Sequence, residues 1–129
     1  MTGAIKKVLV VEDEDDIREV LCSALEFVCE FTVEPCASGF QAIEKAATFG
    51  PDLMLLDVMM PGMDGPQTLS KLRQIPGLEA TPVIFVTAKA MPAEIAHFKS
   101  LGALGVIVKP FDPMAICDQI IALAAAAGG

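Results

Sequence analysis

The stretch Asp52–Gly65, which reads DLMLLDVMMPGMDG, decides the fold of this chain. It opens with an apolar run, Leu53–Leu56, that is too short for an ordinary helix and predicts a buried strand. The run ends on Asp57, and the Pro61-Gly62 pair then makes the chain turn. Because a carboxylate at the end of a buried strand is poorly solvated, Asp57 requires a cation, hydrogen-bond donors or a covalent partner.

Further short apolar runs on both sides of this stretch predict more strands. They are Lys6–Val11, Phe31–Pro35, Val83–Val86 and Val106–Val108. Helix-start signals lie between and after the runs, at Asp15, Ser38, Pro66, Met91 and Asp112-Pro113. In the first helix, the residues expected to face inward are Ile17, Val20, Leu21, Ala24 and Val28. Strand and helix therefore alternate five times, which predicts an α/β fold with a doubly wound, five-stranded parallel sheet.

Length and charge narrow the classes of function. The 129 residues are enough for one domain with its own core, expected to span residues 1–129. The net charge of −8 gives no electrostatic attraction to nucleic acid or to an anionic membrane. No apolar run approaches the roughly 20 residues of a membrane span, and the N-terminus lacks the apolar region of a signal peptide. We therefore expect a cytoplasmic protein with no nucleic-acid or membrane partner.

The cysteines and the histidine offer no metal site. Cys22, Cys29, Cys36 and Cys117 show neither C-x-x-C spacing nor partner histidines. We expect them to be free, mostly buried thiols in a reducing compartment, with Cys22 and Cys29 serving in packing. The single histidine, His97, excludes a multi-histidine metal site and is expected to be exposed on its helix.

Polar side chains with complementary chemistry follow four of the five predicted strands. Glu12 and Asp13 follow the first, Asp57 the third, Thr87 the fourth and Lys109 the fifth. In a doubly wound sheet, ligands bind beyond the carboxyl ends of the strands. The five side chains are therefore expected to converge on one small region.

Their chemistry favours a metal ion and a phosphoryl group. Two carboxylates about 4 Å apart repel by about 4 kcal/mol at an effective dielectric near 20, so three together call for a divalent cation. All-oxygen ligands suit Mg²⁺, or Mn²⁺, and Mg²⁺ also binds phosphate oxygens. A carboxylate can attack phosphorus to form an acyl phosphate, while Lys109 and Thr87 hold the oxygens that the metal leaves free.

At these positions the sequence resembles the receiver domains of two-component response regulators. Four motifs carry the resemblance: Val8–Asp13 (VLVVED), Leu55–Gly65 (LLDVMMPGMDG), Val86–Lys89 (VTAK) and Lys109–Phe111 (KPF). They occur in the family's order and span nearly the whole chain. The resemblance implies a flavodoxin-like (βα)5 fold with strand order 2-1-3-4-5.

The resemblance also implies a role for each residue of the site. Asp57 accepts a phosphoryl group from a histidine kinase or a histidine phosphotransfer protein. The implied metal ligands are Glu12, Asp13, Asp57 and the main-chain carbonyl of Met59. Lys109 contacts the phosphoryl group, Thr87 moves toward it, and the Lys109-Pro110 bond is cis. Relatives commonly carry Tyr or Phe three residues before the site lysine, where this chain has Val106.

The chain ends soon after its last predicted helix, so we expect no output domain. We expect the single-domain type of receiver, which resembles the chemotaxis response regulator. Such a protein is not an enzyme beyond phosphorylating and dephosphorylating itself at Asp57. It would bind an unknown downstream protein through its fourth helix, fifth strand and fifth helix, as a monomer or weak dimer. The alternative is a receiver excised from a hybrid histidine kinase or larger regulator.

Three other interpretations compete with this one. Asp13-Glu14-Asp15 imitates the D-x-D pattern of haloacid-dehalogenase-like phosphatases, with Asp13 as the nucleophile, but this leaves Asp57 unexplained. A flavodoxin-like electron carrier usually stacks its flavin on Trp or Tyr, and the chain has neither. A pseudo-receiver that never takes phosphate would not need the complete set of site residues.

Overall fold

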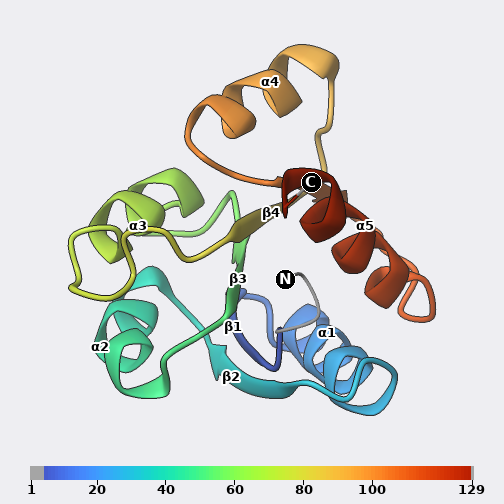
Figure 1. Ribbon diagram of the computed structural model, residues 1–129, viewed down its shortest axis with the longest axis horizontal. Helices are drawn as coiled ribbons and strands as arrows, with labels where there is room; N and C mark the ends of the chain where they lie inside the picture. The colour runs from blue at the N-terminus through green and yellow to red at the C-terminus, as the bar shows by residue number, and fades with distance from the viewer. Residues whose placement is uncertain (1–4, 129) are drawn as a thin grey trace.

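The computed structural model describes residues 5–128 as a parallel sheet covered by helices on both faces (Figure 1). The strands are β1 (Lys7–Val11), β2 (Thr32–Cys36), β3 (Leu53–Asp57), β4 (Val83–Thr87) and β5 (Gly105–Val108). The helices are α1 (Asp15–Phe27), α2 (Gly39–Phe49), α3 (Gly65–Leu72), α4 (Pro92–Ser100) and α5 (Ile116–Gly128). The five strands lie in the order β2-β1-β3-β4-β5, so the predicted fold and strand order are confirmed. Residues 1–4 and 129, the two ends of the expected domain, lie outside the described residues.

Two apolar cores fill the spaces between the sheet and its helices. Alternate residues of β1 point to opposite sides, with Leu9 in the core under α2, α3 and α4 and Val10 in the core under α1 and α5. Every residue of β3 and β4 is buried, which explains why their sequences are continuous apolar runs and do not alternate. Because β3 is central and covered on both faces, Asp57 at its end is held in a fixed position.

The inward stripe predicted for α1 was partly wrong. Val20 and Val28 are 46% and 39% exposed, while Leu25 is fully buried beside Leu21 and Ala24. The helix contacts the core through a narrow stripe at spacings of three and four, and the predicted stripe included apolar residues on its flank. His97 is exposed, as predicted.

The start of α5 also differs from the prediction. Asp112 does not begin the helix; its Oδ1 accepts the backbone N–H of Met114 at 2.9 Å and closes a turn. The helix itself begins at Ile116, whose side chain is fully buried against the sheet. Within the described part of the chain, no helix combines the length and the apolar character that a membrane crossing needs.

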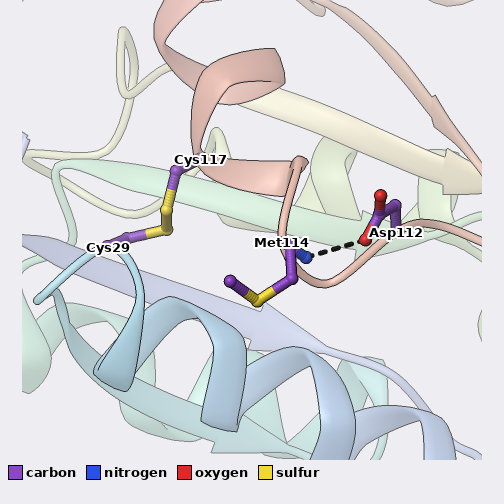
Figure 2. Close-up of a disulfide and its surroundings, with 4 residues drawn as sticks. All are labelled: Cys29, Asp112, Met114 and Cys117. Carbon is purple, nitrogen blue, oxygen red and sulfur yellow. Dashed lines mark hydrogen bonds between the residues drawn. A yellow bond between two sulfur atoms is a disulfide. The ribbon is translucent and has the colours of Figure 1, made fainter.

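The cysteine prediction was wrong for two of the four residues. Cys29, just after α1, and Cys117, in the first turn of α5, form a disulfide (Figure 2). They are 88 positions apart in sequence, so no local spacing signals the pair, and only the packing of α5 against α1 brings them together. Cys22 and Cys36 are free, as predicted.

Candidate functional site

The carboxyl ends of four strands bring the predicted site residues to one edge of the sheet. Asp57 and Thr87 are the last residues of β3 and β4, Glu12 and Asp13 follow β1, and Lys109 follows β5. One carboxylate oxygen from each of Glu12, Asp13 and Asp57 lies within 4.8 Å of the other two. The sheet therefore brings five residues from four separate parts of the sequence to the same edge.

Lys109 links two of the carboxylates. Its Nζ lies 2.7 Å from Glu12 Oε1 and 3.1 Å from Asp57 Oδ1. Glu12 and Asp57 are only 1% and 4% exposed, so both charges are largely removed from water. One ammonium against three carboxylates leaves an excess of negative charge, and a buried charge without a partner is costly.

This imbalance changes the protonation of the two paired groups. Burial, followed by the charge of Glu12, raises the pKa of Asp57 from 3.8 to about 7, although Lys109 opposes the rise. Burial disfavours the charged form of Lys109, but its hydrogen bonds to Glu12 and Asp57 outweigh burial and raise its pKa. Without a further cation, the site therefore favours the protonated form of Asp57 more than water does.

Glu12 is oriented by its own backbone neighbourhood. Its Oε2 accepts the backbone N–H of Glu14 at 3.1 Å, and Arg18 Nη1 donates to the Glu12 carbonyl oxygen at 2.9 Å. Arg18 lies one turn into α1 and holds the loop that carries Glu12. Sequence reasoning missed this contact, because an arginine in the exposed first turns of a helix carries no signal of its partner.

The site fits a hard divalent cation. Glu12 Oε1 is buried, and its one close partner among the described residues is the Lys109 ammonium, so this carboxylate oxygen keeps a second lone pair for a metal. The donors are oxygens from Glu12, Asp13 and Asp57, the ligand type that Mg²⁺ and Mn²⁺ prefer. Met59 lies in the loop that follows β3 and is 79% exposed.

Thr87 ends β4 and Lys109 follows β5, the two strands on the far side of β3 from β1. Thr87 is buried, its Oγ1 accepts the backbone N–H of Lys89 at 3.1 Å, and its carbonyl accepts the N–H of Lys109 at 2.8 Å. The Lys109-Pro110 peptide is cis, as the resemblance implied. The hydroxyl of Thr87 is thus tied to the loop that leads from β4 to α4.

Comparison with known proteins identifies the class. Residues 8–121 match the model of the response regulator receiver domain, and the chain belongs to this family. Over 93% of its length it superimposes on the chemotaxis protein CheY4 of Vibrio cholerae, with a TM-score of 0.85 and 31% identity, and covers 99% of that chain. It also resembles, with a TM-score of 0.77 and 29% identity over 94% of its length, 91% of a signal receiver domain of a histidine kinase from Syntrophus aciditrophicus.

Among curated proteins, the chain is 39% identical over 91% of its length to the transcriptional regulatory protein ResD of Bacillus subtilis. It is 35% identical over 81% of its length to the response regulator Rre1 of Synechocystis. The matches span 47% and 46% of those proteins, so the chain covers about half the length of these relatives. What is shared with them is the receiver domain, a signalling domain and not an enzyme in the ordinary sense.

The raised pKa of Asp57 predicts how stability depends on pH in the absence of metal. The folded state holds the Asp57 proton more tightly than the unfolded chain does. The protonated carboxyl therefore adds to the free energy of unfolding below pH 3.8, and this stabilisation is lost as the pH rises to about 7. Asp57→Asn should remove this loss and stabilise the metal-free protein at pH 8 by roughly 2–4 kcal/mol. Urea unfolding of both proteins in the presence of a chelator, at pH 5 and pH 8, measures this difference in the free energy of unfolding. Asp16→Asn, at an exposed position, is the control; equal stability of Asp57→Asn and the parent protein at pH 8 would contradict the assigned burial.

Proposed function

We propose that this chain is a phosphoacceptor in a two-component or phosphorelay system. Asp57 takes a phosphoryl group from a histidine kinase or a histidine phosphotransfer protein. The observation that supports this most strongly is the pairing of a buried Asp57 with Lys109 beside two more carboxylates, within a receiver-family chain. A solvated helix cap would need neither the burial nor the lysine.

In the transfer, a free oxygen of Asp57 attacks the phosphorus of the donor phosphohistidine. The new P–O bond forms as the P–N bond breaks, and the electron pair leaves on the histidine nitrogen. Lys109, which already holds Asp57 Oδ1, remains beside the acyl phosphate and offsets the charge of its oxygens. Thr87 donates a hydrogen bond from its hydroxyl to a phosphoryl oxygen, and it can do so while Oγ1 still accepts the Lys89 N–H, because a hydroxyl both donates and accepts.

The metal would be held by Glu12, Asp13, Asp57 and the main-chain carbonyl of Met59. Mg²⁺ or Mn²⁺ would neutralise the charge that the transferring phosphoryl group brings to the site. Glu12 Oε1 pairs with Lys109 and keeps a second lone pair for the metal. The chain's catalysis is limited to its own phosphorylation and dephosphorylation.

The test of this function is labelling with acetyl phosphate, a small phosphodonor that needs no kinase. The purified protein should gain one phosphoryl group in millimolar Mg²⁺ and none in excess chelator. Equal labelling with and without the cation would contradict the metal site, and no labelling in Mg²⁺ would contradict the phosphoacceptor role.

We further propose that the signal leaves through the loop after β4 and the face formed by α4, β5 and α5. Val106, on β5, is partly buried against the core, and valine has no ring to swing between an outward and an inward pocket. The aromatic part of the usual switch is therefore absent. The loop Ala88–Met91, tied to Thr87 through Lys89, and α4 around Phe98 take over that role.

Nuclear magnetic resonance of the protein with and without beryllofluoride, a phosphoryl mimic, checks this route. Amide shifts should be large at Ala88–Met91 and around Phe98, while the methyl groups of Val106 keep one rotamer. Thr87→Ala, measured with the same mimic, is the matched control and should suppress the shifts in the loop. Large changes at Val106 with an unmoved loop would show that the route is wrong.

The partner of this face is an unidentified downstream protein, and not nucleic acid or membrane, since the chain carries a net charge of −8. We propose that the receiver works in the cytoplasm as a monomer or weak dimer. The chain covers 99% of the Vibrio cholerae CheY4 chain, which supports action as a single receiver. The chain also spans about half the length of ResD and Rre1. This supports an alternative, in which it is the receiver module of a longer regulator or hybrid kinase. Pull-downs with and without beryllofluoride, followed by identification of the retained protein, test the partner.

A further inference from the structure

The disulfide between Cys29 and Cys117 lies outside the phosphoryl site and plays no part in its chemistry. It joins the end of α1 to the first turn of α5, across 88 residues of sequence (Figure 2). Met114 and Asp112 lie in the turn just before α5, which is the continuation of the segment that begins at Lys109. The bridge therefore fixes the far end of a segment whose first residue is part of the site.

Each cysteine is held in place by contacts other than the bridge. The backbone N–H of Cys29 donates to the Ala24 carbonyl at 3.2 Å, and that of Phe31 donates to the Leu25 carbonyl at 3.0 Å. On the other side, Ile116 is fully buried next to Cys117 and anchors the start of α5. The Cα atoms are 5.5 Å apart, within the roughly 4.4–6.8 Å that disulfides require. The bridge can therefore open and close with little movement of the backbone.

Both cysteines of the pair are accessible in a way that Cys36 is not. Cys29 and Cys117 are half-buried, and a groove lined in part by Phe27, Val28 and Pro113 runs beside the chain next to Cys29. Cys36 is fully buried, and burial raises the pKa of both Cys22 and Cys36 to about 11. The two free thiols therefore stay protonated and react slowly.

Acidic residues near the two cysteines favour a small thiol or disulfide reagent of positive charge. Glu30 and Asp118 are exposed and directly follow the two cysteines in sequence. The groove also includes Asp16 and Glu19. Negative charge at this surface attracts cationic reagents and repels anionic ones.

We propose that Cys29 and Cys117 form a reversible redox modification site, oxidised by a small cationic disulfide and reduced by the corresponding thiol. One cysteine thiolate attacks a sulfur of the small disulfide, breaks its S–S bond and expels a thiolate. The other cysteine thiolate attacks the protein sulfur of the mixed disulfide, forms the bridge and expels the second thiolate. The two cysteine protons end on the expelled thiolates, so the protein loses two hydrogens and the small disulfide becomes two thiols.

This redox site goes beyond the proposed function. It rests on that function in one respect only: the cytoplasm proposed for the receiver is reducing, and a disulfide there is transient. Opening the bridge frees the start of α5 from α1, and closing it anchors the segment Lys109–Cys117. Redox state would thereby act on the same face that we propose carries the phosphoryl signal.

The experiment equilibrates the protein with cystamine and cysteamine at increasing ratios, then alkylates free thiols under denaturing conditions and measures intact mass. Two alkylation sites should disappear together as the ratio rises, and reappear when it falls. Oxidised protein should melt about 10 °C above the reduced form, because the bridge closes a long loop. A Cys22→Ser, Cys36→Ser double variant should behave in the same way, whereas Cys29→Ser and Cys117→Ser should each carry a single cysteamine adduct at high ratios, because the remaining cysteine has no partner with which to close the bridge.

Three results would overturn the proposal. They are a bridge that persists in excess cysteamine, stable single adducts without ring closure, and a double variant that no longer titrates. Circular dichroism of the Cys29→Ser and Cys117→Ser variants shows whether they remain folded, and if they do not, native-state alkylation of the parent protein decides the same question. Because the readout does not involve Asp57, the Asp57→Asn protein should titrate unchanged, so failure here is separate from failure of the proposed function.

Discussion

Asp57→Asn should abolish labelling from acetyl phosphate, whereas Asp13→Asn should slow it by at least about tenfold without abolishing it. An amide at position 57 cannot form the acyl phosphate, so no residual reaction is expected there. Asp13 contributes an oxygen to the cation site but is not the residue paired with Lys109. The measurement is the initial rate of label incorporation, monitored by intact mass, in millimolar Mg²⁺.

Asp16→Asn provides the control, since Asp16 is exposed and is not a member of the carboxylate cluster. Its rate should match that of the parent protein. The opposite pattern, labelling that survives Asp57→Asn and is lost in Asp13→Asn, would favour a haloacid-dehalogenase-like phosphatase over a receiver.

Gly65→Ala should destabilise the protein by about 2–3 kcal/mol and disturb the phosphoacceptor at the same time. A Cβ atom at position 65 would lie 2.5 Å from the carbonyl oxygen of Asp57 and 3.0 Å from the Cα of Val58. Both are backbone atoms, so the strand end itself would have to move. The N–H of Gly65 also donates to the Val58 carbonyl at 2.8 Å, a bond that such a movement would break.

The expected result is a lower urea midpoint together with slower labelling. Gly77→Ala is the matched control, because its Cβ would meet nothing within 4 Å although its φ is +95°. It should lose only about 1–2 kcal/mol, from the left-handed backbone, and label at the normal rate. A Gly65→Ala protein with unchanged stability would show that the β3–α3 loop is more adaptable than the contacts imply.

The gathering of the candidate site residues at one edge of the sheet was predictable, because each one stands next to a strong local signal. Glu12, Asp57 and Thr87 follow or end apolar runs that are too short for an ordinary helix. Lys109 stands at the end of another such run, directly before Pro110. Parallel strands in a doubly wound sheet bring such positions to one edge, so the sequence pattern determines their neighbourhood. The distances and the pKa of Asp57 depend on side-chain packing and could not be obtained this way.

The Cys29–Cys117 pair escaped prediction for the opposite reason. Neither cysteine belongs to a motif, and their contact depends on how far α5 extends along α1. The exposure of Val20 has a similar origin, because an apolar residue on the flank of a helix fits the same periodicity as one in the core. Tertiary packing, and not local sequence, decides both features.

The most direct test of the central claim is to locate the phosphoryl group on the chain. Labelled protein is reduced with borohydride, which converts an aspartyl phosphate into a stable alcohol, and its peptides are sequenced by mass spectrometry. The modification should be found at Asp57 alone, in the peptide that contains Met59, and should be absent when Mg²⁺ is removed before labelling. Modification at Asp13, or at no aspartate of a protein that labels in Mg²⁺, would contradict the assignment of Asp57 as the phosphoacceptor.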